Sequence, residues 1–220
     1  MKKIIIFGAG SGGKEVLNIV IKDINKLRGN EQFEVLGFVD KKLEQYGEDF
    51  DNSQFKICDL PLINISSITS DSHIFGVCDV MRPKIKKEIV DEEIIGNDIQ
   101  LATLVHPNTF VSSSANIGRG SVVNPFSSIS YDVSVGKCAK LNFGSHIGHN
   151  TVVGDFTFVG PSATIAGNCT IGDLCIIGAG ATIIDGIKVP NNTIIGAGSV
   201  VTQNIEKSGT YIGNPVRKII

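Results

Sequence analysis

Aliphatic residues recur at every sixth position through the C-terminal half of the chain. The series runs unbroken from Val105 to Val201 and has seventeen members. Two residues before the aliphatic position, from Thr109 onward, Thr, Ala, Ser or Cys stands in fourteen of sixteen repeats, the exceptions being Val133 and Ile187; Gly follows the aliphatic in eight repeats. The charged residues of this region avoid both positions. Both stripes are therefore predicted to face a buried core.

A six-residue period matches neither the 3.6-residue turn of a helix nor the two-residue alternation of a simple strand. It fits a short strand followed by a tight turn, with Gly or Asn supplying a positive φ angle at the corner. Successive strands would then stack and pair through their backbones. Because the register never breaks, the walls should be flat, and a site on a flat wall would need depth from a neighbouring copy of the chain.

The first 104 residues instead alternate between strand-like and helix-like patterns. Strands are predicted at residues 3–7, 34–39, 73–77 and 101–105, and helices at residues 14–27 and 83–95. This alternation indicates a small parallel sheet covered by helices. The expected fold class is α/β plus all-β, with a Rossmann-like domain over residues 1–104 and a β-helix domain with a C-terminal cap over residues 105–220.

Charge and composition exclude several classes of protein. Residues 1–104 hold 30 charged residues and residues 105–201 hold 8, but the net charge is only −2, without the basic runs that nucleic-acid binding needs. No apolar stretch approaches the roughly 18 residues of a membrane span, and the four apolar residues after Lys3 are too few for a signal peptide. Five cysteines without CxxC spacing argue against a disulfide framework or a zinc ribbon. We therefore expect a cytoplasmic protein with reduced thiols.

A glycine-rich loop separates the first predicted strand from the first helix. Gly8, Gly10 and Gly13 form a GxGxxG motif, and Asp40 ends the second predicted strand. Such a loop offers backbone N–H groups to an anion, and the acid can bind a ribose or base. NAD is one possible ligand, but about 100 residues make only half of a double Rossmann unit, which favours a single nucleotide such as that of a nucleotide-sugar. A tight turn without a ligand is the third interpretation.

The two halves together resemble the PglD/NeuD-type family of bacterial sugar O- and N-acyltransferases. The resemblance covers essentially the whole chain and rests on FGAGSGGKEVLNI, GFVDK, FGVCDVMRPKI, LVHP, LNFGSHIGHN and YIGNPVRK. It implies a left-handed β-helix with three hexads per coil and about five coils. It also implies acetyl-CoA as co-substrate and a homotrimer with active sites between the subunits.

Within LNFGSHIGHN, the family's catalytic histidine falls on His149. The residue follows inward-facing Ile147 by two positions, so its imidazole should project from a corner and can serve as a general base near neutral pH. Relatives often place an acid directly after this histidine, whereas this chain has Asn150, which can accept a hydrogen bond but carries no charge. Asp155 or a main-chain carbonyl is the alternative partner. Asn142 also matches a family position and is expected to orient the histidine or the substrate.

The resemblance implies contacts to both substrates. The nucleotide-sugar is expected at residues of the glycine-rich loop and of the segments that follow the second and third strands: Gly10, Ser11, Gly12, Gly13, Asp40, Lys41, Asp79 and Arg82. At Gly12 many relatives carry a histidine, so the identity of the nucleotide is left open, as is the use of a free sugar. The expected contacts of acetyl-CoA are Gly167, Ala179, Ala197, Arg217 and Lys218. The small size of Gly167, Ala179 and Ala197 is equally explained by the limited space at a corner of the solenoid, without a ligand.

Two further histidines raise the question of a metal. His146 and His106 could together suggest a zinc site shared between subunits, as in β-helical carbonic anhydrases. The spacing differs from that of those enzymes and no acid adjoins the pair, so we expect no metal. His146 is expected in a cleft or in solvent, and His106, before Pro107, in a turn between the domains.

The expected reaction is transfer of an acetyl group from acetyl-CoA to the C4 amino group of a nucleotide-linked deoxyamino sugar used in surface glycans. The attack is direct, with His149 as general base and a backbone N–H stabilising the oxyanion. Two alternatives stay open: O-acetylation of a sugar hydroxyl, as with sialic acid, and a non-catalytic nucleotide-binding scaffold.

Overall fold

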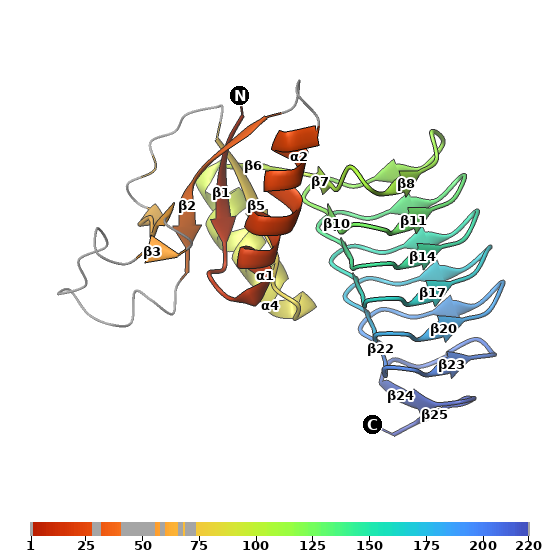
Figure 1. The fold of residues 1–220 in the computed structure, drawn as a ribbon. Helices are drawn as coiled ribbons and strands as arrows, with labels where there is room; N and C mark the ends of the chain where they lie inside the picture. Colours follow the sequence, from red (N-terminus) through yellow and green to blue (C-terminus); the bar gives the residue numbers. More distant parts are fainter. Residues whose placement is uncertain are drawn as a thin grey trace. The chain divides into compact units, whose positions relative to one another are not determined.

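The computed structural model describes residues 2–27, 32–40, 56–57, 60–65, 68 and 74–219. The chain divides into two compact units (Figure 1). The first unit is Met1–Met81 with Ile85–Ala102, and the second is Arg82–Lys84 with Thr103–Ile220.

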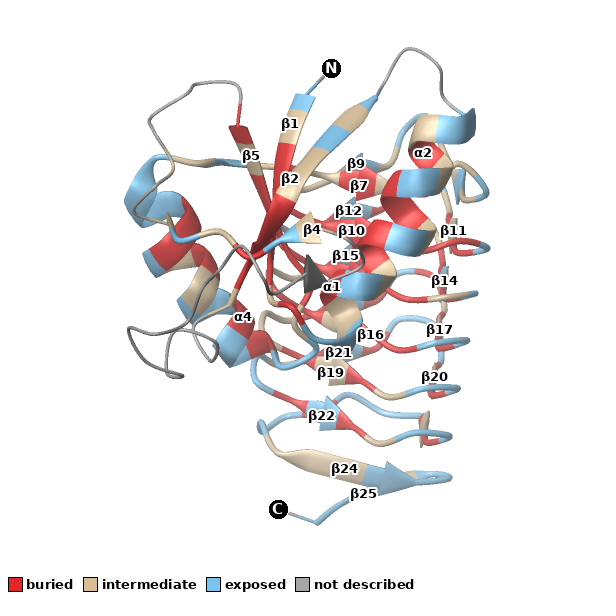
Figure 2. Cartoon of the chain, turned by 60° about the vertical axis from the view of Figure 1, so that its left-hand side comes forward, coloured by how far each residue is buried: buried red, intermediate tan, exposed pale blue. Residues whose placement is uncertain are grey.

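The first unit is built around a four-stranded parallel sheet in the order β2-β1-β5-β6. Its strands are β1 (Lys2–Phe7), β2 (Phe33–Val39), β5 (Ile74–Cys78) and β6 (Gln100–Leu101). A small antiparallel pair joins β3 (Lys56–Ile57) to β4 (Leu60–Pro61). Four consecutive residues of β1, Ile4 to Phe7, are fully buried, which means that both faces of the sheet are covered. Figure 2 shows the C-terminal part of β1 and most of β5 as buried.

Two helical segments accompany this sheet. The first consists of α1 (Ser11–Glu15), η1 (Val16–Ile21) and α2 (Lys22–Leu27) in direct succession. The second consists of α4 (Pro83–Ile89), η3 (Val90–Ile94) and η4 (Ile95–Asn97). In the described part of the chain this amounts to a four-stranded sheet with two helical segments, so the predicted alternation is present, while a complete Rossmann domain is not.

The second unit is a left-handed, β-helix-like solenoid of two-residue strands that form three parallel walls. Wall one consists of β7 (Leu104–Val105), β10 (Val122–Val123), β13 (Lys140–Leu141), β16 (Phe158–Val159), β19 (Ile176–Ile177) and β22 (Ile194–Ile195). Wall two consists of β8 (Phe110–Val111), β11 (Ser128–Ile129), β14 (His146–Ile147), β17 (Thr164–Ile165), β20 (Thr182–Ile183) and β23 (Val200–Val201). Wall three consists of β9 (Asn116–Ile117), β12 (Ser134–Val135), β15 (Val152–Val153), β18 (Thr170–Ile171) and β21 (Lys188–Val189).

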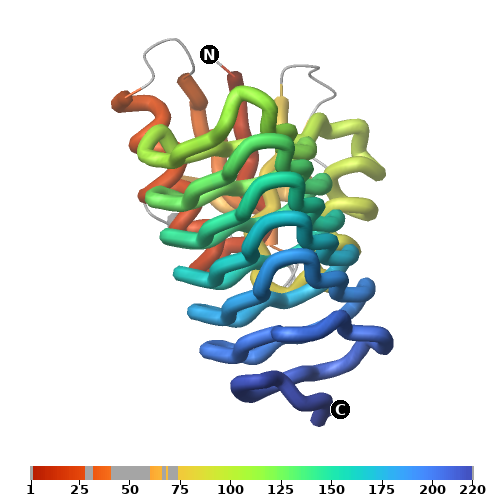
Figure 3. Tube along the Cα trace, turned by 90° about the vertical axis from the view of Figure 1, so that its right-hand side faces the viewer, coloured from red at the N-terminus to blue at the C-terminus, as the bar shows by residue number. Residues whose placement is uncertain are grey.

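Each coil of this solenoid spans 18 residues, as three hexads require. Ile147 pairs with Ile165, for example, and Ile165 with Ile183, always in parallel register. Figure 3 follows the coils as they stack one upon the next toward the C-terminus. The stack ends in a hairpin of β24 (Thr210–Gly213) and β25 (Val216–Lys218), in which β24 continues wall one.

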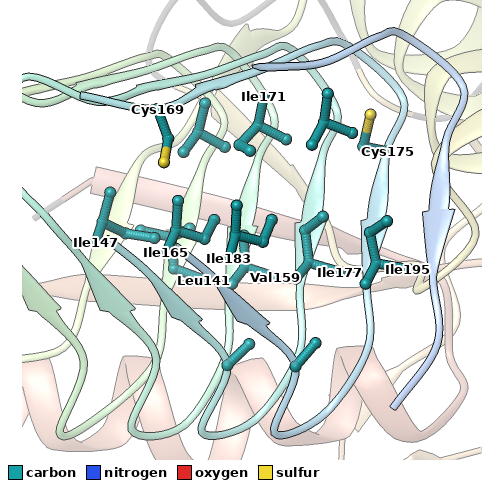
Figure 4. Close-up of a cluster of buried hydrophobic side chains, with 14 of the residues drawn as sticks. Leu141, Ile147, Val159, Ile165, Cys169, Ile171, Cys175, Ile177, Ile183 and Ile195 are labelled. Carbon is teal, nitrogen blue, oxygen red and sulfur yellow. The ribbon is translucent and has the colours of Figure 1, made fainter. Parts of the chain in front are cut away.

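The aliphatic stripe forms the core of the solenoid, as predicted. From Val123 to Val201 every aliphatic residue of the six-residue series is at most 2% exposed, and Figure 4 shows these side chains directed into the interior. From Ser121 onward the small-residue stripe is also buried, and several of its hydroxyl groups donate to carbonyls of the following coil, as Thr151 does to Ala166 at 2.9 Å. Val133 and Ile187, the exceptions in size, are buried as well.

The corners differ from the sequence prediction in one respect. Positive φ angles occur at the third residue after the aliphatic, and Phe126 (φ 63°) and Leu174 (φ 57°) adopt them as Asn150 (φ 55°) does. The expectation of only Gly or Asn there was wrong, because pairing along the stack imposes this conformation whatever the side chain. The glycine directly after the aliphatic serves another purpose. A Cβ on Gly148 would lie 2.5 Å from the Ala166 carbonyl carbon, so only glycine permits this spacing between coils.

Two cysteines of the small-residue stripe are protonated at neutral pH. Burial strengthens this preference, because it raises the pKa of the Cys169 thiol above its ordinary value and raises the pKa of the Cys175 thiol to about 11. Cys78, Cys138, Cys169 and Cys175 form no disulfides with one another, and Cys58 lies outside the described residues. None of the helices in the described ranges combines the length and apolar character needed to cross a bilayer.

Candidate active site

His149 lies in a turn that joins wall two to wall three, between β14 and β15. Local packing fixes its position: Ile147 is buried in the core, Gly148 fits tightly against the next coil, and Asn150 turns the chain with its positive φ angle. The backbone carbonyl of His149 accepts a hydrogen bond from Asn168 N at 2.8 Å. The half-buried imidazole therefore projects from a rigid corner, as the sequence predicts.

The imidazole is held by two neighbours. Its Nδ1 lies 3.0 Å from Asn150 Oδ1, and its ring stacks on that of Tyr131 with 5.1 Å between centroids and 6° between planes. Since the amide oxygen can only accept, Nδ1 is the donor in this pair. A general base at this position would therefore act through Nε2. Asn150 thus supplies the orienting hydrogen bond that the sequence analysis left to several alternatives.

Residues at equivalent positions of successive coils form a column along this edge, here called the histidine column. Its members, each 18 positions after the previous one, are Tyr131, His149, Gly167 and Asp185. A Cβ on Gly167 would lie 2.6 Å from His149 Cε1, 2.7 Å from His149 Nε2 and 2.9 Å from Asp185 Oδ1. The missing side chain leaves room for the imidazole on one side and for the carboxylate on the other. Asp185 Oδ1 also accepts a hydrogen bond from Asn168 Nδ2 at 3.1 Å.

Asn142 and Asp155 lie at other edges of the solenoid. Asn142 belongs to a turn from wall one to wall two, where its Oδ1 accepts from Asn124 Nδ2 at 2.9 Å and from Phe143 N at 2.8 Å. Asp155 belongs to a turn from wall three to wall one and accepts from Lys137 N at 2.8 Å. The structure thus gives both residues a part in holding adjacent coils together, away from the turn of His149.

The other two histidines within the described ranges, His146 and His106, each have a different partner, and His73 lies outside those ranges. His146 is exposed on β14, with Nδ1 2.7 Å from Ser128 Oγ. His106 is buried, and its Nδ1 accepts from Asn108 N at 3.0 Å, which stabilises the predicted turn. The described residues contain no group of three His, Cys, Asp or Glu side chains that could hold a metal ion.

The expected acetyl-CoA contacts fall on two different edges. Gly167 is in the histidine column, whereas Ala179 and Ala197 lie in turns from wall one to wall two, one coil apart. A full side of the solenoid, wall two, therefore separates these positions within one chain. Arg217 and Lys218 are exposed on β25, in the terminal hairpin.

In the first unit the glycine-rich loop is tightly supported. Asp40 Oδ2 accepts from Ala9 N at 2.7 Å, so this carboxylate braces the loop. A Cβ on Gly12 would lie 2.0 Å from the carbonyl oxygen of buried Asp79, so this position has no room for a side chain. Gly10 has open space around its Cα, and Ser11 is exposed.

The other expected nucleotide-sugar contacts are placed differently. A Cβ on Gly13 would lie 2.0 Å from the carbonyl oxygen of Gly8, so this glycine serves the close approach of helix and loop. Arg82 is exposed and belongs to the second unit. Lys41 lies outside the described residues.

Comparison with known proteins supports the solenoid fold. Residues 150–185 match the model of the bacterial transferase hexapeptide repeat (six repeats). The acetyltransferase domain of PglB from Neisseria gonorrhoeae FA1090, solved in complex with acetyl coenzyme A, is 25% identical, with a TM-score of 0.82 and 99% of each chain covered. The resemblance to sugar acetyltransferases of the hexapeptide-repeat family is confirmed.

Two further solved structures match the chain over its length. WeeI from Acinetobacter baumannii AYE is 26% identical with a TM-score of 0.78, and all of both chains is covered. PerB from Caulobacter crescentus, in complex with CoA and GDP-perosamine, is 22% identical with a TM-score of 0.83, covering 100% of this chain and 98% of PerB. Curated protein sequences gave no match.

The sequence analysis missed Tyr131 and Asp185. Both were accessible in principle, because they stand one coil before and two coils after His149 at multiples of 18 residues. The six-residue period identifies the core residues. One coil contains three such repeats, so positions 18 residues apart are neighbours along an edge.

Proposed function

We propose that this protein transfers an acetyl group from acetyl-CoA to the amino group, at C4, of a nucleotide-linked deoxyamino sugar used in surface glycans. The observation that carries the proposal is the imidazole of His149, oriented through Nδ1 by Asn150 and presenting Nε2 at an edge of a hexapeptide-repeat solenoid. The similarity to the PglB acetyltransferase domain in complex with acetyl coenzyme A supports the choice of acyl donor.

The reaction is a direct transfer without a covalent enzyme intermediate. The amine nitrogen attacks the thioester carbonyl, and His149 Nε2 removes a proton from that nitrogen as the C–N bond forms. The tetrahedral intermediate then collapses, the C–S bond breaks, and the thiolate of CoA leaves and takes up a proton. Among the described residues the Gly167 N–H donates no hydrogen bond, so this amide is our candidate for stabilising the oxyanion.

The substrate-binding residues are proposed from the family resemblance of the sequence. Acetyl-CoA lies along Gly167, Ala179 and Ala197, with Arg217 and Lys218 near its phosphates. The first unit acts as a Rossmann-like nucleotide-binding domain, in which the open backbone at Gly10 and exposed Ser11 meet the phosphates of the nucleotide-sugar. Because wall two separates the two groups of acetyl-CoA contacts, a homotrimer that joins these edges from different copies completes the site.

The test compares His149→Gln with His146→Gln, a matched change three residues away on an exposed ring bonded to Ser128. Release of CoA thiol is followed with acetyl-CoA and a panel of UDP-, GDP- and dTDP-linked 4-amino sugars. We expect turnover to fall at least about a hundredfold in His149→Gln, since the general base is lost, and to persist in His146→Gln. Unchanged turnover in His149→Gln would refute the role of His149. No turnover by the wild type with any acceptor would instead favour a non-catalytic scaffold.

A further inference from the structure

The carboxylate of Asp185 lies beside the proposed general base. The position of a Cβ on Gly167 is 2.7 Å from His149 Nε2 and 2.9 Å from Asp185 Oδ1, so the two atoms are no farther apart than the sum of these distances. The side chain of Asp185 is exposed, and Asn168 Nδ2 holds its Oδ1 at 3.1 Å. A basic nitrogen and a fixed carboxylate oxygen are thus neighbours on one edge, with no side chain between them.

Two acceptors at such a separation suit a donor with several N–H bonds. An ammonium group has three donors and can bond a carboxylate oxygen and an imidazole nitrogen together, whereas a hydroxyl group has one. The ammonium is also attracted by the carboxylate charge, and a neutral hydroxyl is not. Asn150, the orienting partner of His149, provides no charge of its own.

We propose that Asp185 is the residue that selects an amine over a hydroxyl as acetyl acceptor, by binding the acceptor's ammonium group next to His149. The inference rests on the proposed acetyl transfer. The ammonium donates one hydrogen bond to Asp185 and another toward Nε2. One proton of the ammonium is lost to solvent, and the resulting amine keeps one N–H bonded to Asp185 and another directed at Nε2. His149 removes this second proton as the nitrogen attacks the thioester carbon, and the proton then passes to the departing thiolate of CoA. Asp185 touches the reacting group without exchanging a proton.

The decisive variant is Asp185→Asn, which keeps the size of the side chain and an oxygen for Asn168 while removing the charge. For the amino-sugar acceptor that the wild type uses, we expect kcat/KM to fall about tenfold or more, mainly through a higher KM, because a charge-assisted hydrogen bond is lost. With the corresponding 4-hydroxy sugar nucleotide, turnover should stay at its wild-type level. Asp185→Glu, which restores the charge, should recover part of the loss.

Asp132→Asn is the matched control. Asp132 is an exposed carboxylate on the same edge, next to Tyr131 but outside the histidine column. Removing its charge should change kcat/KM for the amine less than about twofold, because an exposed charge without a direct contact contributes little. Equal KM values for the amine in wild type and Asp185→Asn would overturn the inference while leaving acetyl transfer intact. Equal losses in Asp185→Asn and Asp132→Asn would overturn it too, since only net charge would then matter. A wild type without turnover would overturn the proposed function and this inference together.

Discussion

At the scale of single residues, Gly167 decides where the imidazole of His149 can lie. The ring edge occupies the space that a methyl group would fill, only 2.6 Å from the expected Cβ. The ring cannot retreat freely, because Tyr131 stacks on it and Asn150 holds Nδ1. A single added carbon must therefore move the imidazole or the backbone of the coil.

We predict that Gly167→Ala lowers kcat about a hundredfold, since displacement of a catalytic group by about 1 Å can cost that much. Steady-state kinetics with thermal unfolding in parallel would measure it. The control is Gly144→Ala, at a corner with φ 62° where a Cβ meets Ser162 Oγ at an ordinary 3.6 Å. That change should cost about 1 kcal/mol of stability through backbone strain and leave kcat intact. Normal kcat in Gly167→Ala would show that the imidazole need not occupy this space.

Sequence reasoning located single residues only where a pattern or a resemblance pointed to them. His149 was placed at a corner because Ile147 marked the inward position. Asn142 was grouped with His149 through the resemblance, yet a separation of seven residues exceeds one hexad and moves a residue to a different edge. Asp185 stands 36 residues from His149, and its proximity depends on the absent side chain at Gly167, which no local pattern indicates.

At the scale of the elements, each coil is stabilised mainly by its inward aliphatic residues. Ile165 on β17 is fully buried and pairs with Ile147 and Ile183 in the coils on either side. Its neighbour on the same strand, Thr164, points outward and is partly exposed. The two residues therefore separate core packing from strand formation within one two-residue element.

We predict that Ile165→Ala lowers the free energy of unfolding by about 3 to 4 kcal/mol, because the rigid stack cannot close the cavity. Thr164→Ala should change it by no more than about 0.5 kcal/mol. Urea unfolding followed by circular dichroism measures both values. Similar losses for the two variants would mean that the strand itself, rather than the buried aliphatic side chain, determines stability here.

The elements of the solenoid could be predicted because its period is a direct consequence of burial. The corner conformations could not, since Phe126 and Leu174 adopt positive φ angles against their intrinsic preference. The left-handed backbone conformation of these two residues is unfavourable by itself. It is imposed by the strand pairing of the coils on either side. In the first unit the strand and helix pattern was recovered, although nothing in the pattern indicated that Gly12 makes room for the carbonyl of Asp79.

At the scale of the whole molecule, the unbroken solenoid has flat walls, and its proposed catalytic and acetyl-CoA residues lie on two edges. His149 and Gly167 share one edge, and Ala179 and Ala197 share another, with wall two between them. No movement within a coil can bring these edges together without breaking the core. If both groups act on one acetyl-CoA molecule, they come from different copies of the chain.

We predict that two inactive variants restore each other's activity when mixed. His149→Gln lacks the base, and Ala197→Trp blocks the opposite edge with a large side chain. A site is complete when the His149 edge comes from an Ala197→Trp copy and the Ala197 edge comes from a His149→Gln copy. After co-refolding at equal amounts, roughly a quarter of the sites should be active, since each of the two contributing copies is the required one half of the time in a ring with head-to-tail contacts. Sedimentation velocity would verify that both variants and their mixture assemble alike. A mixture as inactive as its components, despite normal assembly, would mean that each chain builds its site alone and that acetyl-CoA does not use the edge of Ala197.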